Sequence, residues 1–172
     1  MTLNPLFALI SLLIFLYSQN ANAQPSLAQF LHSSHQEYQK QAQSSSNQFS
    51  EVHIVIGNES ADLDSIVSAI AYAYYLNQVE GKGHDYFPVI NIQREDIALR
   101  RDALYLFQLL GISLNDLLFL DDVSFDSLFA QKRLRLILVD HNVLRPSQEH
   151  LSPAIERVID HHVDENRDYP LL

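Results

Sequence analysis

Residues 52–65 read VHIVIGNESADLDS, and this stretch decides the class of fold. Four of the first five residues are β-branched and apolar, and the run ends at Gly57, which predicts a short buried strand. An acidic loop follows. From about Ser65 to Val79 apolar residues recur at intervals of three and four, which predicts a helix with one apolar face.

The alternation of strand and helix continues along the rest of the chain. The pattern predicts further strands over 86–91, 117–120, 134–139 and 157–159. It predicts helices over 97–110, where Gly111 ends the helix, over 124–130, and around 149–155. Strands that are apolar at nearly every position are covered on both faces. We therefore expect an α/β fold, with a mainly parallel sheet flanked by helices.

The first 24 residues contain no charged side chain. Leu6–Tyr17 is an apolar run of the length found in signal peptides, and Ala21-Asn22-Ala23 resembles a cleavage site. This pattern predicts a signal peptide over 1–23, with cleavage before Gln24. After cleavage we expect no stable membrane span. The expected location is the secretory pathway or the outside of the cell. An uncleaved anchor and a misplaced start codon are the alternatives.

Residues 24–50 are polar and rich in Gln and Ser. Leu27, Phe30 and Leu31 could form one face of a short helix, and the remainder has the composition of a linker. We therefore expect a polar lead-in over 24–50 and a single domain over 51–172.

The composition excludes several classes of protein. The chain has 172 residues, no cysteine and a net charge of −10. The lack of cysteine rules out a disulfide scaffold, a cysteine-ligated zinc site and a thiol nucleophile. The acidic surface argues against nucleic acid as a partner, because it repels the phosphate backbone.

Acidic and imidazole side chains follow three of the predicted strands. Asp62 and Asp64 follow the first strand, Asp140 follows the fourth, and His161 and His162 follow the fifth. The carboxyl ends of parallel strands meet at one edge of a sheet, where ligands bind. Carboxylates and imidazoles are ligands for divalent metals, and carboxylates crowded together need a cation to offset their repulsion. The sequence therefore predicts a metal site at this edge.

Each of these motifs also has a purely structural explanation. Asp62, Asp64 and Ser65 precede a helix, where such residues commonly cap the helix end. The segment 140–142 could be an ordinary exit from a strand, and a pair of histidines is often only a surface feature. Their agreement at one sheet edge is what favours the metal site.

Three segments, GNESADLDS (57–65), VDHN (139–142) and IDHH (159–162), resemble the DHH phosphoesterase superfamily. Together with PVINIQRED (88–96), they are most similar to its exopolyphosphatase and Prune branch. The resemblance covers about residues 52–169 and implies the N-terminal, Rossmann-like domain of that family.

The resemblance also implies roles for individual residues. It makes Asp62 and Asp64 ligands of two different metal ions, Asp140 the carboxylate that bridges them, and His161 a further metal ligand. His162 corresponds to a residue that contacts substrate phosphate, so Asp140 and His162 are the expected catalytic residues. The ions expected are two Mn²⁺ or Mg²⁺.

The remaining site residues are open to two interpretations. Asn58 stands where pyrophosphatase relatives have a histidine ligand, so it is expected to be a weak ligand or a support for other ligands. Asp160 is expected to orient its neighbours. The basic cluster of Arg94, Arg100 and Arg101 could contact phosphate, or could pair with nearby acidic residues.

The activity implied by the resemblance is hydrolysis of inorganic polyphosphate or pyrophosphate with release of orthophosphate. Family members have a further metal-binding Asp and a second domain beyond the DHH motif, so we expect the sequence to be a truncated form of a longer enzyme. A non-catalytic, Prune-like module that binds metal, phosphate or a protein partner is the alternative function. Relatives in this branch are mostly cytoplasmic, which is the alternative location.

Overall fold

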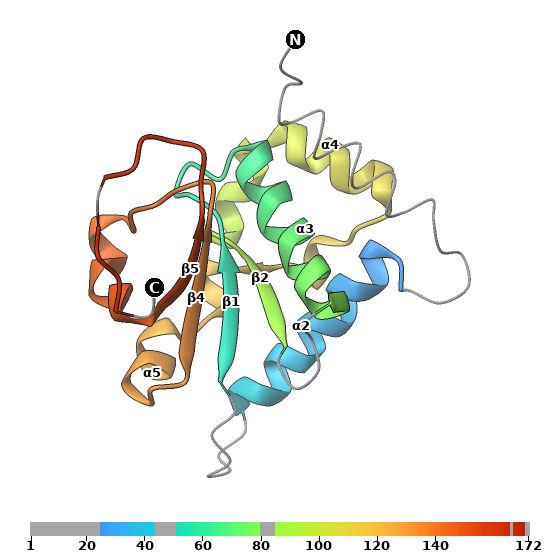
Figure 1. Cartoon of the computed structure of the whole chain (residues 1–172). Helices are drawn as coiled ribbons and strands as arrows, with labels where there is room; N and C mark the ends of the chain where they lie inside the picture. The colour runs from blue at the N-terminus through green and yellow to red at the C-terminus, as the bar shows by residue number, and fades with distance from the viewer. Residues whose placement is uncertain (1–24, 44–50, 80–84, 166, 171–172) are drawn as a thin grey trace.

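A five-stranded parallel sheet forms the centre of the protein (Figure 1). The computed structural model describes residues 25–43, 51–79, 85–165 and 167–170; the expected signal peptide lies outside these ranges. The strands are β1 (Val52–Ile56), β2 (Tyr86–Ile90), β3 (Leu118–Phe119), β4 (Leu134–Val139) and β5 (Ile155–Ile159). The α-helices are α2 (Leu27–Gln43), α3 (Leu63–Val79), α4 (Arg101–Leu110) and α5 (Phe125–Ala130). Four 3-10 helices complete the fold: η1 (Arg94–Leu99), η2 (Leu114–Asp116), η3 (Leu120–Asp122) and η4 (Pro146–Ala154). The predicted α/β class and parallel sheet are confirmed.

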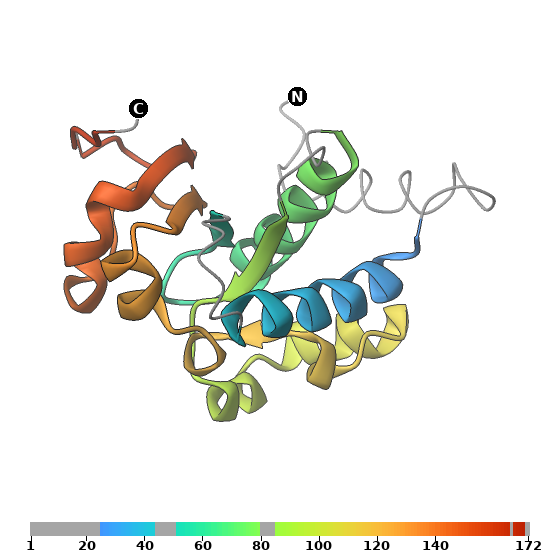
Figure 2. The ribbon, with the colours of Figure 1, turned by 90° about the horizontal axis from the view of Figure 1, so that it is seen from below.

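Two apolar cores lie on the two faces of the sheet. Val55 and Ile137 point into one core with residues of α3 and α4, whereas Ile54 and Leu136 point into the other with residues of α5 and η4. Figure 2 shows α5 and η4 on the opposite side of the sheet from α3. Burial on both faces explains why the strands are apolar at consecutive positions rather than at alternate ones.

The strand order places a switch point beside β1. The order is β3-β2-β1-β4-β5, so the chain runs from β1 outward to β3 and then returns to the other side of β1 as β4. Ligands of open α/β sheets bind at such a point, outside the carboxyl ends of the strands. The residues that follow β1 and β4 are therefore brought together.

The helix α2 is longer than the sequence predicts. It runs through 17 residues, and the expected linker character of residues up to Gln43 is wrong. Phe30 and Leu31 enter one core and Tyr38 enters the other, where its ring meets Phe87 edge-on at 5.5 Å between centroids. The helix contacts β2 and η2. Its exposed positions are mostly polar, which is why the composition of this segment resembles that of a linker.

The predicted helix over 97–110 is interrupted. The 3-10 helix η1 ends at Leu99, and α4 begins at Arg101 after Arg100 adopts non-helical angles of φ −99° and ψ 68°. Gly111 takes a left-handed φ of 65° and ends α4 as expected. None of the helices in the described ranges is long and apolar enough to cross a membrane.

Replacing Leu31 with alanine tests whether α2 belongs to the folded domain. Leu31 is 1% exposed, so Leu31→Ala should lower the free energy of unfolding by about 2–5 kcal/mol in urea titration. Leu109→Ala is the matched control, because Leu109 is 64% exposed. Equal, small losses in both variants would show that α2 does not pack on the sheet.

Candidate metal centre

Three carboxylates meet at the carboxyl edge of the sheet. Asp62 lies directly before α3, Asp64 lies in its first turn, and Asp140 follows β4. One oxygen of each lies within 4.8 Å of the others. Asp62 also accepts a hydrogen bond from the backbone N–H of Ser65 at 3.3 Å, so it caps the helix as well as facing the other two carboxylates.

The electrostatics of this cluster are unfavourable. Burial, followed by the charges of Asp64 and Asp62, raises the pKa of Asp140. Burial and the neighbouring Asp64 carboxyl also raise the pKa of Asp62. Asp140 is 7% exposed, so little water is available to screen these charges. A bound cation would offset the repulsion.

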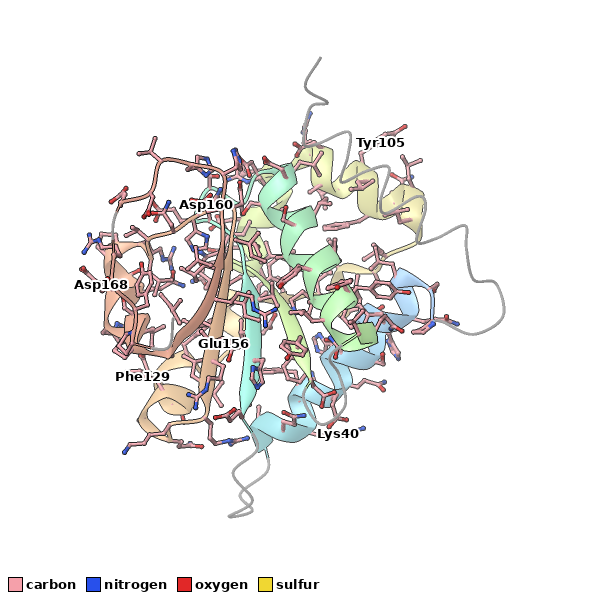
Figure 3. The ribbon with its side chains drawn as sticks, in the orientation of Figure 1. Lys40, Tyr105, Phe129, Glu156, Asp160 and Asp168 are labelled. Atoms are coloured by element: carbon pink, nitrogen blue, oxygen red, sulfur yellow. The ribbon has the colours of Figure 1, made fainter. Side chains whose placement is uncertain are left out.

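Two histidines extend the cluster on the side of β5. One oxygen of Asp140 lies 3.1 Å from Nε2 of His161, and Asp140, His161 and His162 form a second group of potential ligands. Figure 3 shows Asp160, which precedes this pair, at the upper end of the sheet, far from Lys40 at the lower end. Asp140 is thus common to both groups of ligands.

His162 is held by Asp160. Its Nδ1 lies 2.7 Å from Oδ1 of Asp160, and this hydrogen bond raises the pKa of His162. Burial acts to raise the pKa of Asp160, but its hydrogen bonds with His162, Asn142 and the His161 backbone outweigh it, and the pKa is lowered. Asp160 is therefore a stable anion beside the histidine pair.

Asn58 supports a ligand instead of presenting one. Its Nδ2 donates to Oδ2 of Asp140 at 2.7 Å. Its Oδ1, the atom that could bind a metal, accepts from the N–H and hydroxyl of Ser60 and the N–H of Ala61. Of the two interpretations of Asn58, the geometry favours the supporting one.

Comparison with known proteins agrees with this arrangement. The DHH family, N-terminal domain, matches residues 53–171. The chain belongs to the DHH family. The motif that gives the family its name is Asp160-His161-His162 here, and the resemblance expected from the sequence is confirmed.

The relatives of this DHH chain include named exopolyphosphatases. It is 40% identical over 119 residues to exopolyphosphatase PRUNE1 of Bos taurus, covering 69% of this chain and 26% of that protein. The same protein of Homo sapiens is 39% identical over 119 residues, with the same coverage. The chain therefore spans about a quarter of the length of these relatives.

Two buried amide side chains near the site, Asn91 and Gln148, were not predicted from the sequence. Asn91 donates from Nδ2 to the carbonyl of Gly57 at 2.8 Å and accepts from Nε2 of Gln148 at 3.1 Å. Gly57 itself has no room for a side chain, since a Cβ there would lie 2.2 Å from Oγ of Ser65. These contacts fix the end of β1 against the start of α3. The polar Asn91 at the end of an apolar strand was the available signal.

His141 is not one of the ligands in this arrangement. Burial lowers the pKa of its imidazole, which favours the neutral ring. Its Nδ1–H donates to the carbonyl of Val139 at 2.9 Å, two residues back on β4. Nδ1 is thus occupied by a backbone carbonyl, and His141 belongs to neither group of potential ligands in the described ranges.

The three arginines of the basic cluster have different surroundings. The guanidinium of Arg94 donates to the carbonyls of Leu114 and Leu117 and to Asp122 at 2.5 Å, and it lies over the ring of Phe119. These contacts favour the second of the two interpretations of Arg94, pairing with an acidic residue. Its acidic partner, Asp122, is distant in sequence.

Arg100 and Arg101 remain candidates for phosphate contact. Arg100 donates to the carbonyl of Ser60 in the loop that carries Asp62, so its guanidinium lies beside the site. Arg101 is exposed at the start of α4.

The donor set suits divalent metal ions. Three carboxylates and two imidazoles supply oxygen and nitrogen ligands, which Mn²⁺ binds well and Mg²⁺ binds through the carboxylates. Burial, and after it the neighbouring carboxylates, raise the pKa values of Asp62 and Asp140, and a bound cation would offset both effects. The residues present therefore fit the metal dependence of the family.

Asp140→Asn should stabilise the metal-free protein and abolish its response to metal. The pKa of Asp140 is raised on folding, so the carboxylate destabilises the folded state above that pKa. Without metal, the variant should melt higher by about 3 °C at neutral pH, the shift that roughly 1 kcal/mol produces in a protein of this size. This difference should shrink as the pH falls through the pKa of Asp140. With Mn²⁺, only the wild-type protein should gain stability.

The exposed Asp168 supplies the control for this measurement. Asp168→Asn should leave both the metal-free Tm and the gain with Mn²⁺ unchanged. A gain with Mn²⁺ that survives in Asp140→Asn would contradict the assignment of Asp140 as a ligand.

Proposed function

We propose that this chain carries the metal site of a hydrolase that releases orthophosphate from inorganic polyphosphate or pyrophosphate. The observation that supports the proposal best is that Asp140 belongs to both groups of potential ligands. A carboxylate in that position can bridge two metal ions. The names of the relatives, exopolyphosphatase PRUNE1, supply the class of substrate.

The residues that would hold the ions are Asp62, Asp64, Asp140 and His161. Mn²⁺ or Mg²⁺ bound there would lower the pKa of a water molecule and draw charge from phosphoryl oxygens. Asn58 keeps Oδ2 of Asp140 in place through its hydrogen bond of 2.7 Å. The ligands are thus oriented before a substrate arrives.

In this proposal His162 contacts the substrate phosphate. Its side chain is 53% exposed, and Asp160 holds its Nδ1. The raised pKa of His162 favours the imidazolium, a cation that can bind a phosphate oxygen. When water attacks the terminal phosphorus and the P–O bond to the next phosphate breaks, His162 can give its proton to the leaving oxygen. Arg100 and Arg101 would offset the charge of the polyanion beside an acidic protein.

A phosphate-release assay tests the proposal. The chain, supplied with Mn²⁺ and polyphosphate or pyrophosphate, should release orthophosphate, and Asp140→Asn should lower the rate at least 100-fold, roughly the effect of removing a central catalytic group. Asp168→Asn should leave the rate unchanged. Activity that persists in Asp140→Asn would refute the role of Asp140. Stabilisation by Mn²⁺ with no phosphate release would favour the alternative, a non-catalytic module that binds metal or phosphate.

We also propose that residues 1–23 direct the protein into the secretory pathway. The support is the uncharged apolar run Leu6–Tyr17 followed by Ala21-Asn22-Ala23. Amino-terminal sequencing of the protein from secreting cells should begin at Gln24. A protein found in the cytoplasm and beginning at Met1 would overturn this proposal.

A further inference from the structure

A line of hydrogen bonds leads away from the metal ligands through Asp160 to Asn142. The carboxylate of Asp160 is 5% exposed and divides its two oxygens between two tasks. Oδ1 accepts from the backbone N–H groups of His161 and His162 and from Nδ1 of His162. Oδ2 accepts from Nδ2 of Asn142 at 2.6 Å. Asn142 is thus bonded to the oxygen that the histidines do not use.

Asn142 is itself fixed at the exit of β4. It lies two residues after Asp140, and its Nδ2 also donates to the carbonyl of Val163 at 3.0 Å. Its Oδ1 accepts from the N–H of Glu165 at 3.4 Å, and its backbone carbonyl accepts from the hydroxyl of Tyr169 at 2.6 Å. The side chain therefore joins the end of β4 to the segment that follows β5.

The consequence for His162 follows from the chemistry of imidazole. A neutral ring carries its proton on one nitrogen, and the hydrogen bond made by one nitrogen decides which one. Asp160 can hold the proton on Nδ1 only while its carboxylate keeps its present orientation. Without Asn142, Oδ2 would be a buried anionic oxygen with no donor among the residues that the structure describes, and the carboxylate would turn toward other donors or water.

We propose that Asn142 is a positioning residue for His162: acting through Asp160, it keeps Nδ1 of the ring bonded to Asp160. The neutral ring then carries its proton on Nδ1, and Nε2 is the nitrogen that takes up the second proton and, in the imidazolium, donates to the substrate phosphate. The role toward phosphate rests on the proposed function, whereas the effect on the ring does not. The order Asn142–Asp160–His162 repeats a general arrangement in which a catalytic group is oriented by a second residue and that residue by a third.

The state of the ring can be read directly by NMR. In ¹⁵N-labelled chain with Mg²⁺, at a pH at which the ring is neutral, long-range ¹H–¹⁵N correlations show which nitrogen of His162 carries the proton. His162→Gln identifies the signals among those of the eight histidines. The wild-type protein should show the proton on Nδ1, and Asn142→Ala should show a substantial population with the proton on Nε2. The proposal is wrong if Asn142→Ala has the wild-type spectrum, or if wild-type His162 carries its proton on Nε2.

Exchanging the amide and the carboxylate between positions 142 and 160 distinguishes a specific effect on the ring from a general loss of structure. Asn142→Asp places a carboxylate against Asp160 and should disturb the ring as Asn142→Ala does. With Asp160→Asn added, the amide at position 160 can donate to the carboxylate at position 142, and its Oδ1 can still accept from Nδ1 of His162. This double variant should return the proton to Nδ1. If the double variant stays as disturbed as Asn142→Asp, the specific bond between the two side chains is not what holds the ring.

Kinetics connect the ring to catalysis. Asn142→Ala should lower kcat roughly 10-fold, the effect typical of residues that orient a catalytic group, with unchanged KM for polyphosphate and an unchanged gain in Tm with Mn²⁺. Asn115→Ala, at an exposed asparagine, is the matched control and should change nothing. An unchanged kcat, or loss of the response to Mn²⁺ together with kcat, would overturn the positioning role. If the wild-type chain releases no phosphate, the proposed function fails while the NMR experiment still tests the role of Asn142.

Discussion

The repulsion among three carboxylates is the constraint on which the rest of this structure depends. Asp62 and Asp64 lie at the start of α3, after β1, and Asp140 follows β4, so the three meet because β1 and β4 lie side by side. The folded chain accepts unfavourable charge at this edge, where Asp140 is buried. Away from this edge, β1 to β4 are buried between two apolar cores, and these cores supply the stability that the edge lacks.

The supporting contacts around the carboxylates have a common form. Three of them are made by uncharged amide side chains: Asn58 donates to Asp140, Asn91 to the Gly57 carbonyl, and Asn142 to Asp160. An amide can donate to a carboxylate without adding a charge that would compete with a metal ion. These amides orient the site without adding positive charge, so its net charge stays negative. A negative site attracts metal ions, and the bound ions would then attract an anionic substrate.

Much of this could be predicted from the sequence because strands and ligands follow short-range rules. The β-branched runs marked the strands, and the residues that follow them marked the site. The failures involved contacts that are distant in sequence. A segment rich in Gln and Ser gives no sign that Tyr38 is buried against Phe87. The carbonyls that bind Arg94 belong to Leu114 and Leu117, in and just after η2, about 20 residues further along the chain. Likewise, whether Asn58 presents its oxygen or uses it for Ser60 depends on the fold of one loop.

The backbone of Asp140 has a consequence for how such a fold diverges. Its φ of 63° lies in the left-handed region, which asparagine, aspartate and glycine enter readily and most other residues do not. Few side chains can therefore occupy this position, and the one closest in shape to aspartate lacks its charge. A lineage that exchanges aspartate for asparagine at this position can lose the metal chemistry of the site and keep the fold around it. The same shape can then persist as a scaffold on which other recognition surfaces develop.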